Sequence, residues 1–274
     1  MIQISRENLI NTYDVFLLDA YGVLVDAHGT LPGAQKFLQD LRAADKAYCL
    51  VTNDASKDLA ALTAKYEELS LPIGAHQICS SGLLLAPYVQ EHRLMDAHAF
   101  VLGPQPSKQL AMDAGLTVCE RLDDSIEILV IADEAGYDFL PTMDAVTSFL
   151  MNRASQGALP HLVLLNPDLI YPKGAGEFGW AAGSIALAFE ENLKRFVPRA
   201  GFTKLGKPHT PIFKAALKPF SDKKVVMLGD QLHTDVLGAN QNGIDACLVG
   251  TGLTTVPPNA LGDLAPKFWL ADLL

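Results

Sequence analysis

The stretch Phe16-Leu17-Leu18-Asp19-Ala20-Tyr21-Gly22-Val23-Leu24 places a short apolar run directly before a carboxylate and a glycine. Short apolar runs of this kind are typical of strands that are buried on both faces of a parallel sheet. Three further runs have the same form: 47–51 before Thr52, 225–228 before Gly229-Asp230, and 246–249 before Gly250. Helical patterns lie between the runs, at 33–44, 57–69, 211–217 and 234–242. This alternation predicts an α/β fold with a doubly wound parallel sheet.

Three of these predicted strands end in a residue with a polar side chain that can bind a ligand or take part in catalysis. Asp19, Thr52 and Asp230 each follow an apolar run directly or after one glycine. In open parallel sheets, ligands bind just beyond the carboxyl ends of the strands. We therefore expect two carboxylates and a hydroxyl to meet in one crevice.

The middle of the chain carries strand and helix patterns of its own. Strand patterns lie at 99–102, 127–131 and 162–165, and helical patterns lie at 106–114, 141–152 and 181–194. We expect a smaller α/β domain, residues 83–200, inserted into a core made of residues 1–82 and 201–274.

The composition narrows the class of protein and partner. Of the 274 residues, 49% are hydrophobic and 19% are charged, as expected of a folded globular chain. The net charge of −10 argues against a nucleic-acid partner, so a phosphate site must be built locally from a metal ion, a lysine or backbone N–H groups. The four cysteines are widely spaced, which favours free thiols over a zinc site or disulfides. Without a signal-peptide pattern or an apolar run of roughly 18 residues, we expect a cytoplasmic protein with no membrane partner.

Three of the polar motifs have both a catalytic and a purely structural interpretation. Asp19, followed by the turn at Gly22, can attack an electrophile or hold a metal, or it can cap a turn. Asp230 and Asp235 suit a hard cation such as Mg²⁺, although Asp235 could simply favour the first turn of a helix. Lys207 precedes a predicted helix N-terminus, where anions bind well, but an isolated lysine is more often a solvated surface residue.

The fourth motif begins at the end of the second predicted strand. Thr52 and Asn53 can donate hydrogen bonds to phosphate oxygens. Asp54 or Ser56 could meanwhile provide the N-cap of the following helix. Both interpretations can hold, because different residues do the two jobs.

In their order and shared position at strand ends, the four motifs resemble those of the haloacid dehalogenase-like (HAD) superfamily. The resemblance is to its class IIA, the NagD-type and p-nitrophenyl-phosphatase-type sugar or nucleotide phosphatases, and it covers nearly the whole chain. It implies a Mg²⁺-dependent phosphatase that acts on a small phosphate ester through an aspartyl-phosphate. It implies that Asp19 is the nucleophile and that Thr52, Asn53 and Lys207 bind the phosphate, with Lys207 also neutralising charge. It further implies that Mg²⁺ is bound by Asp19, the main-chain oxygen of Tyr21 and Asp230, with Asp235 in support.

The position of the insert agrees with this resemblance. Only 33 residues separate Asp19 from Thr52, whereas 155 separate Thr52 from Lys207, which leaves room for a C2-type cap. The segment Asn166-Pro167-Asp168 and the glycine-rich stretch 179–184 are similar to a cap segment that lines the substrate pocket. We therefore expect Asn166 and Asp168 at the substrate, although Asn-Pro-Asp is also a common turn.

Tyr21 departs from the family pattern. Most phosphatases of the superfamily have an aspartate here as the general acid and base, a role that typically contributes about 10²–10⁴-fold to the rate. A phenol titrates near ~10 and is a poor base at neutral pH. Asp26 and His28 follow closely and are candidate substitutes, although both could be solvated turn residues.

The departure at Tyr21 keeps two alternative functions open. An Asp-x-Tyr-Gly sequence also occurs in 2-haloacid dehalogenases, which would make Asp19 the nucleophile of C–halogen cleavage. Those enzymes carry their cap between the first two motifs and need no metal, and both features count against this alternative. The other alternative is a phosphometabolite-binding protein with weak or no turnover. The C2-type cap further implies a homodimer.

Overall fold

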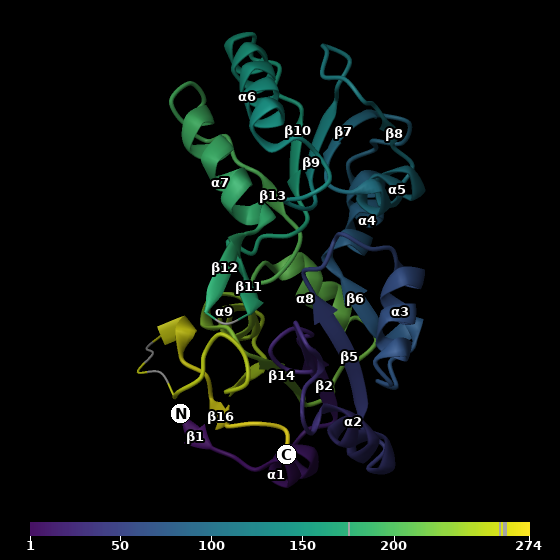
Figure 1. The fold of residues 1–274 in the computed structure, drawn as a ribbon, viewed down its shortest axis with the longest axis vertical. Coiled ribbons are helices and arrows are strands. Elements are labelled where there is room, and N and C mark those ends of the chain that lie inside the picture. The colour runs from purple at the N-terminus through teal and green to yellow at the C-terminus, as the bar shows by residue number, and fades with distance from the viewer. Residues whose placement is uncertain (175, 258, 260–261) are drawn as a thin grey trace.

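The computed structural model describes residues 1–174, 176–257, 259 and 262–274, and its elements form two lobes (Figure 1). The lower lobe in this view is built on a seven-stranded sheet of order β1-β16-β15-β14-β2-β5-β6, parallel throughout. Its strands span Ile2–Gln3 (β1), Phe268–Leu270 (β16), Asp245–Val249 (β15), Val225–Gly229 (β14), Val15–Leu18 (β2), Ala47–Thr52 (β5) and Ile78–Ser80 (β6). The chain runs outward from β2 to β6 and then returns to β14 on the other side of β2. This order confirms the predicted doubly wound sheet, and β2 and β14 flank its switch point.

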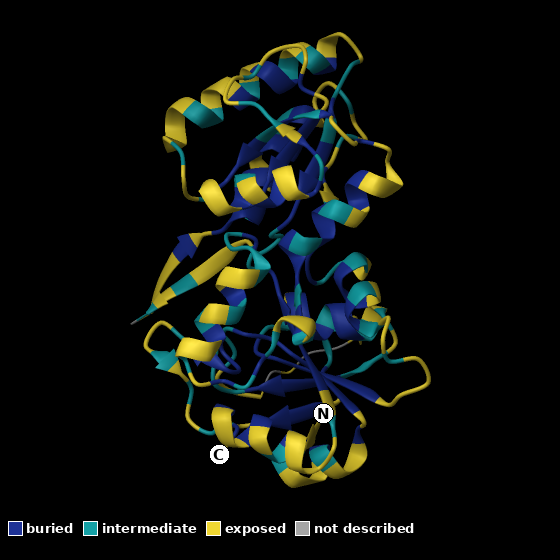
Figure 2. Cartoon of the chain, turned by 90° about the vertical axis from the view of Figure 1, so that its right-hand side faces the viewer, coloured by how far each residue is buried: buried dark blue, intermediate teal, exposed yellow. Residues whose placement is uncertain are grey.

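Successive side chains of the central strands pack into two different cores. Val15 and Leu17 of β2 join the core on one face of the sheet, and Phe16 and Leu18 join the core on the other. Apolar residues at every position are therefore what this strand needs. Figure 2 shows the strands buried between helices whose outer faces are exposed. The helices of the second face are α1 (Arg6–Thr12), α2 (Ala34–Ala43) and α3 (Leu59–Glu68), and those of the first are α4 (Leu85–Glu91), α8 (Thr210–Leu217) and α9 (Leu237–Gln241).

The upper lobe has a parallel sheet of its own, of order β13-β10-β9-β7-β8. Its strands span Thr203–Lys204 (β13), His161–Leu164 (β10), Ile128–Ile131 (β9), His98–Leu102 (β7) and Thr117–Val118 (β8). Helices α6 (Phe139–Ser155) and α7 (Ala182–Leu193) cover one face, while α4 and α5 (Gln105–Asp113) cover the other. The second face shares a continuous hydrophobic core with the lower lobe, so the lobes are packed together. The domain boundaries at 82/83 and 200/201 stay a prediction; β13, which pairs with β10, lies just beyond the second boundary.

Several elements were not predicted from the sequence. A hairpin of β11 (Ile170–Gly174) and β12 (Glu177–Trp180) projects beside the junction of the lobes (Figure 1). A small ribbon of β3 (Val25–Asp26) and β4 (Gly29–Thr30) follows the first motif. The helix predicted at 234–242 begins instead with a π-helical turn at Leu232–Val236, which leads into α9.

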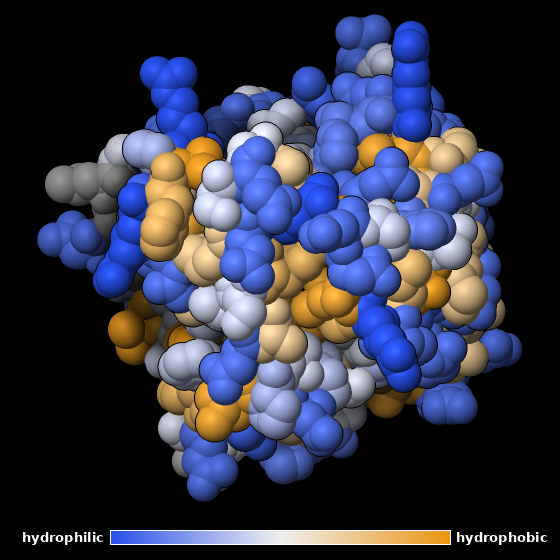
Figure 3. Space-filling model, turned by 90° about the horizontal axis from the view of Figure 1, so that it is seen from above, coloured by the Kyte–Doolittle hydropathy of each residue, from blue (hydrophilic) through white to orange (hydrophobic). Residues whose placement is uncertain are grey.

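The surface carries no extended helix suited to a bilayer: within the described ranges, every helix is too short or too polar to cross one. Seen from the end of the upper lobe, hydrophobic side chains form small groups among hydrophilic ones (Figure 3). A mixed surface of this kind is ordinary for a globular protein. The expected homodimer and cytoplasmic location stay predictions.

Candidate active site

Asp19 lies at the switch point, directly after β2. Its main-chain N–H donates to the carbonyl of Leu228 in β14 (2.9 Å), which fixes the strand end. Its Oδ1 accepts a hydrogen bond from the N–H of Ala20 (2.7 Å), and the side chain is almost fully buried. Gly22 has a φ of 81°, and a Cβ at this position would stand 2.5 Å from the Asp230 carboxylate. The glycine of the first motif therefore allows the turn to pass tightly over a second acid.

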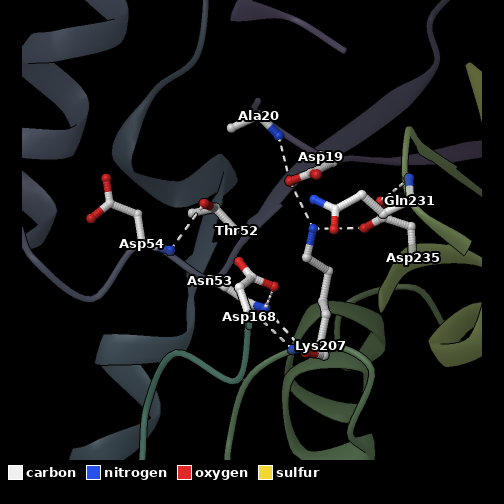
Figure 4. Close-up of polar contacts among 9 residues, drawn as sticks. All are labelled: Asp19, Ala20, Thr52, Asn53, Asp54, Asp168, Lys207, Gln231 and Asp235. Atoms are coloured by element: carbon white, nitrogen blue, oxygen red, sulfur yellow. Dashed lines mark hydrogen bonds and ion pairs between the residues drawn. The ribbon is translucent and has the colours of Figure 1, made fainter. Parts of the chain in front are cut away.

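Lys207 connects the first and last motifs. Its Nζ lies 2.7 Å from Asp19 Oδ1 and 2.7 Å from Asp235 Oδ1, and the side chain is buried. Figure 4 shows the ammonium group between the two carboxylates. Burial would lower the pKa of Lys207, but the charges of Asp19 and Asp235 outweigh it and raise the pKa above the usual value. The interpretation of Lys207 as a solvated surface residue is therefore wrong, because the lysine is enclosed as a cation.

Asn53 fixes the main chain on both sides of Lys207. Its Oδ1 accepts from the Lys207 N–H (2.7 Å), and its Nδ2 donates to the Lys207 carbonyl (3.0 Å) and to Asp168 Oδ1 (2.9 Å). Both amide protons are engaged, so the arrangement favours a positioning role for the side chain over the predicted donation to phosphate. No local sequence pattern indicates this contact, because the two residues are 154 positions apart.

Asp19 and Asp235, which pair with Lys207, form a candidate metal centre together with Asp230. Carboxylate oxygens of Asp19, Asp230 and Asp235 all lie within 4.8 Å of one another, and all three residues are buried. Asp230 Oδ2 accepts from the Leu253 N–H (2.7 Å), while its buried Oδ1 has no hydrogen-bond partner among the described residues. Three buried carboxylates exceed the charge of one ammonium group, and an all-oxygen donor set suits a hard divalent cation. The residues present therefore fit a divalent metal ion.

Burial raises the pKa of two acids of this centre. Burial raises the pKa of Asp19 to about 7, against the opposing charge of Lys207. Burial and the charge of Asp19 also raise the pKa of Asp230 well above its usual value. A bound cation favours the ionised form of both groups. Asp235 is held differently, because its Oδ2 accepts from the Gln231 N–H (3.1 Å) while its Oδ1 receives Lys207.

Thr52 is the last residue of β5 and lies almost fully buried beside the cavity that Asp19 lines. Its Oγ1 accepts from the Asp54 N–H (3.2 Å), which leaves the hydroxyl proton free to donate. The predicted N-cap was wrong. Asp58 caps α3 by accepting from the Ala61 N–H, because Asp54 and Ser56 close an earlier turn and the helix starts only at residue 59.

The Asn-Pro-Asp segment of the upper lobe is both a turn and part of the cavity wall. Asn166 Oδ1 accepts from the Asp168 N–H (3.0 Å), and the Asp168 carbonyl accepts from the Gly183 N–H (2.9 Å) at the start of α7. Burial raises the pKa of Asp168, although Lys207 and Asn53 oppose this. The segment therefore brings the upper lobe into contact with the main site.

A cavity of about 260 Å³ joins these groups. Of the predicted site residues, Asp19, Tyr21, Thr52, Asn53, Asn166, Asp168, Lys207 and Asp230 line it, while Asp235 lies behind Lys207. Residues that the sequence interpretation missed also line it: Lys65, Tyr66, Asp133, Glu134 and Tyr171.

Tyr21 lines the cavity, whereas its candidate substitutes, Asp26 and His28, do not. Burial and the charge of Asp26 raise the pKa of Tyr21, so its phenol stays protonated at neutral pH. Asp26 accepts from the His28 N–H (2.7 Å) in a turn, and both residues line a neighbouring cavity. Their placement favours the turn interpretation over a role as proton shuttle.

Comparison with known proteins finds one family. The model described as haloacid dehalogenase-like hydrolase matches residues 16–117, and a second HAD-hydrolase-like model matches residues 204–274. An acid sugar phosphatase from Staphylococcus epidermidis is 26% identical over 263 residues, which cover 95% of each chain.

Solved structures share the whole fold. A protein from Cytophaga hutchinsonii, described as a possible sugar phosphatase of the HAD superfamily, is 30% identical, with a TM-score of 0.80 over 93% of this chain and 91% of that one. A glycerol phosphate phosphatase from Mycobacterium tuberculosis, in complex with magnesium, has the same fold at 20% identity, with a TM-score of 0.79 over 96% of this chain and 77% of that one.

Proposed function

The chain belongs to the haloacid dehalogenase-like hydrolases. We propose that it is a class IIA member and a Mg²⁺-dependent phosphatase of small phosphomonoesters, sugar phosphates or nucleotide-like compounds. The observation that carries the proposal is Lys207 between Asp19 and Asp235, together with the buried Asp230 oxygen that no described residue contacts by a hydrogen bond. The phosphatases among its relatives support the same reaction class.

The arrangement assigns the two oxygens of Asp19 to different tasks. Oδ1 accepts hydrogen bonds from Ala20 and Lys207, so Oδ2 is the oxygen left to attack phosphorus. A bond forms between Oδ2 and phosphorus while the bond from phosphorus to the alcohol oxygen breaks, and the alkoxide that leaves takes its proton from solvent water. Water then attacks the phosphorus of the aspartyl-phosphate, which releases phosphate and restores the carboxylate.

The remaining groups balance charge and hold the phosphoryl group. Lys207 offsets the charge of the nucleophile, and the free hydroxyl proton of Thr52 donates to a phosphoryl oxygen. Mg²⁺, held by Asp19, Asp230 and the main-chain oxygen of Tyr21 with Asp235 in support, would neutralise phosphate charge and orient the ester. The phenol of Tyr21 is no general base at neutral pH, so we expect slow turnover or a preference for good leaving groups.

The alternative of C–halogen cleavage is not favoured. A relative of this chain is named as a phosphatase, and a metal-free displacement by Asp19 does not require the two further buried acids, Asp230 and Asp235. A binding protein with weak turnover would make the same contacts, and the following experiment distinguishes it from an enzyme.

Phosphate release from a panel of esters, p-nitrophenyl phosphate included, tests the proposal in Mg²⁺ and in EDTA. We expect release in Mg²⁺ only, and none from Asp19→Asn. Asp144→Asn removes a carboxylate from an exposed position of α6 and should keep wild-type activity. Release that survives Asp19→Asn contradicts the proposed nucleophile, and tight binding without any release favours the binding protein.

A further inference from the structure

Both parallel sheets end at the same cavity. The strands of the lower lobe bring Asp19, Thr52 and Asp230 to it. In the upper lobe, the loop after β9 brings Asp133 and Glu134 to the same cavity. The upper sheet therefore adds carboxylates of its own, where the alcohol part of a phosphate ester would lie.

Few basic side chains lie near these carboxylates in the part of the chain that the structure describes. Asp133, Glu134 and Asp168 form no ion pair within 4.0 Å among the described residues, although Asp168 accepts a hydrogen bond from an amide. Apart from Lys207, the only basic side chain that the described residues place on the cavity wall is Lys65. Burial raises the pKa of Asp133 and of Glu134, and the charge of Asp133 raises the pKa of Glu134 further. The outer cavity therefore carries excess negative charge.

An independent feature also indicates a polar ligand. The hydroxyl of Tyr66 is buried and has no hydrogen-bond partner among the described residues, yet Tyr66 lines the cavity. Tyr66 lines the same cavity as Asp19 and Lys207. A buried hydroxyl without a partner is costly unless a ligand satisfies it.

We propose, on the premise of the phosphatase activity above, that the alcohol part of the substrate carries an ammonium group bound by Asp133 and Glu134. A cavity of about 260 Å³ has room for a small amino-alcohol or amino-sugar phosphate. A second anionic group on the substrate meets repulsion from the same carboxylates.

Matched esters that differ only in charge test this proposal. The pairs are 2-aminoethyl phosphate with 2-hydroxyethyl phosphate, and glucosamine 6-phosphate with glucose 6-phosphate, so that the ammonium group stands at two distances from the ester. 2-Phosphoglycolate supplies the anionic counterpart. We expect kcat/KM to favour the better-fitting ammonium ester over its hydroxyl partner by about 10-fold or more, and 2-phosphoglycolate to be the poorest substrate.

Glu134→Gln separates this preference from leaving-group chemistry. It should reduce the ratio of kcat/KM for the ammonium ester to kcat/KM for the hydroxyl ester by about 10-fold. Glu91→Gln makes the same chemical change at an exposed position of α4 and should leave the ratio unchanged. An equal preference in wild type and Glu134→Gln overturns the proposal.

Calorimetric binding of the same esters to Asp19→Asn measures the preference without turnover. Tighter binding of the ammonium ester without hydrolysis by wild type supports the proposed ligand class and overturns the phosphatase. Hydrolysis and binding that are indifferent to the ammonium group support the phosphatase and overturn the ligand class.

Discussion

Replacing Lys207 by methionine tests how strongly the site depends on one buried cation. The substitution keeps most of the side-chain volume but leaves Asp19 and Asp235 without the ammonium group that lies 2.7 Å from each. Removing one partner of a buried ion pair costs about 3–5 kcal/mol of folding stability. Removing one positioned electrostatic group also lowers kcat by about 10²–10³-fold.

The stability loss should depend on pH. Burial raises the folded-state pKa of Asp19 to about 7, above its unfolded value near ~3.9, so folding favours the protonated acid and this group destabilises the fold as pH rises. Lys207 opposes that effect, and without it the folded-state pKa rises further. The free-energy difference between wild type and Lys207→Met should therefore be smaller near pH 5, where the pairing with Asp235 accounts for it, and larger near pH 8.

Urea unfolding in EDTA at several pH values measures this difference, and ester hydrolysis in Mg²⁺ measures the catalytic loss. Lys214→Met, at an exposed position of α8, is the matched control and should resemble wild type. Equal stability of Lys207→Met and wild type at pH 8, or unchanged hydrolysis, would refute the reasoning.

Three further substitutions test the geometry around the site and the fold. Asn53→Ala removes the hydrogen bonds that hold the catalytic lysine's main chain and should lower kcat by about 10-fold or more with little change in KM, as steady-state kinetics can measure; an unchanged kcat contradicts the positioning role. Gly22→Ala places a Cβ against the carboxylate of Asp230, a proposed Mg²⁺ ligand, and should weaken Mg²⁺ activation in a titration; wild-type Mg²⁺ dependence contradicts this. Partial burial would raise the pKa of Asp245, but its hydrogen bonds, including one from Tyr13 (2.5 Å), outweigh burial and lower the pKa. Asp245 therefore stabilises the fold at pH values above its unfolded pKa, and this stabilisation is lost as pH falls through its folded pKa. Tyr13→Phe should therefore destabilise at pH 7 in urea unfolding, and the difference should shrink below about pH 4; a difference that is constant with pH contradicts this.

The residues at strand ends could be predicted because the signal is local. A buried parallel strand is a continuous apolar run, and the polar residue that ends it falls at the edge where ligands bind. Asp19, Thr52 and Asp230 follow directly from that rule and line one cavity.

The remaining parts of the site depend on contacts between distant segments. The hydrogen bonds from Asn53 to Lys207 span 154 residues, and no local pattern distinguishes an amide that binds phosphate from one that holds a main chain. Asp133 and Glu134 also follow a predicted strand, so the same rule could have found them had it been applied to the insert. The hairpin β11–β12 was missed because its alternation is short and interrupted by glycine and proline.

The central claim is that Asp19 carries the phosphoryl group during turnover. Acid quenching during p-nitrophenyl phosphate hydrolysis in Mg²⁺, followed by borohydride reduction and peptide mass spectrometry, tests it, because reduction converts an aspartyl-phosphate into homoserine. The structure predicts homoserine at position 19, and none after quenching Asp19→Asn. Phosphate release by the wild type with position 19 recovered only as aspartate, or with the modification at another carboxylate, would contradict the claim.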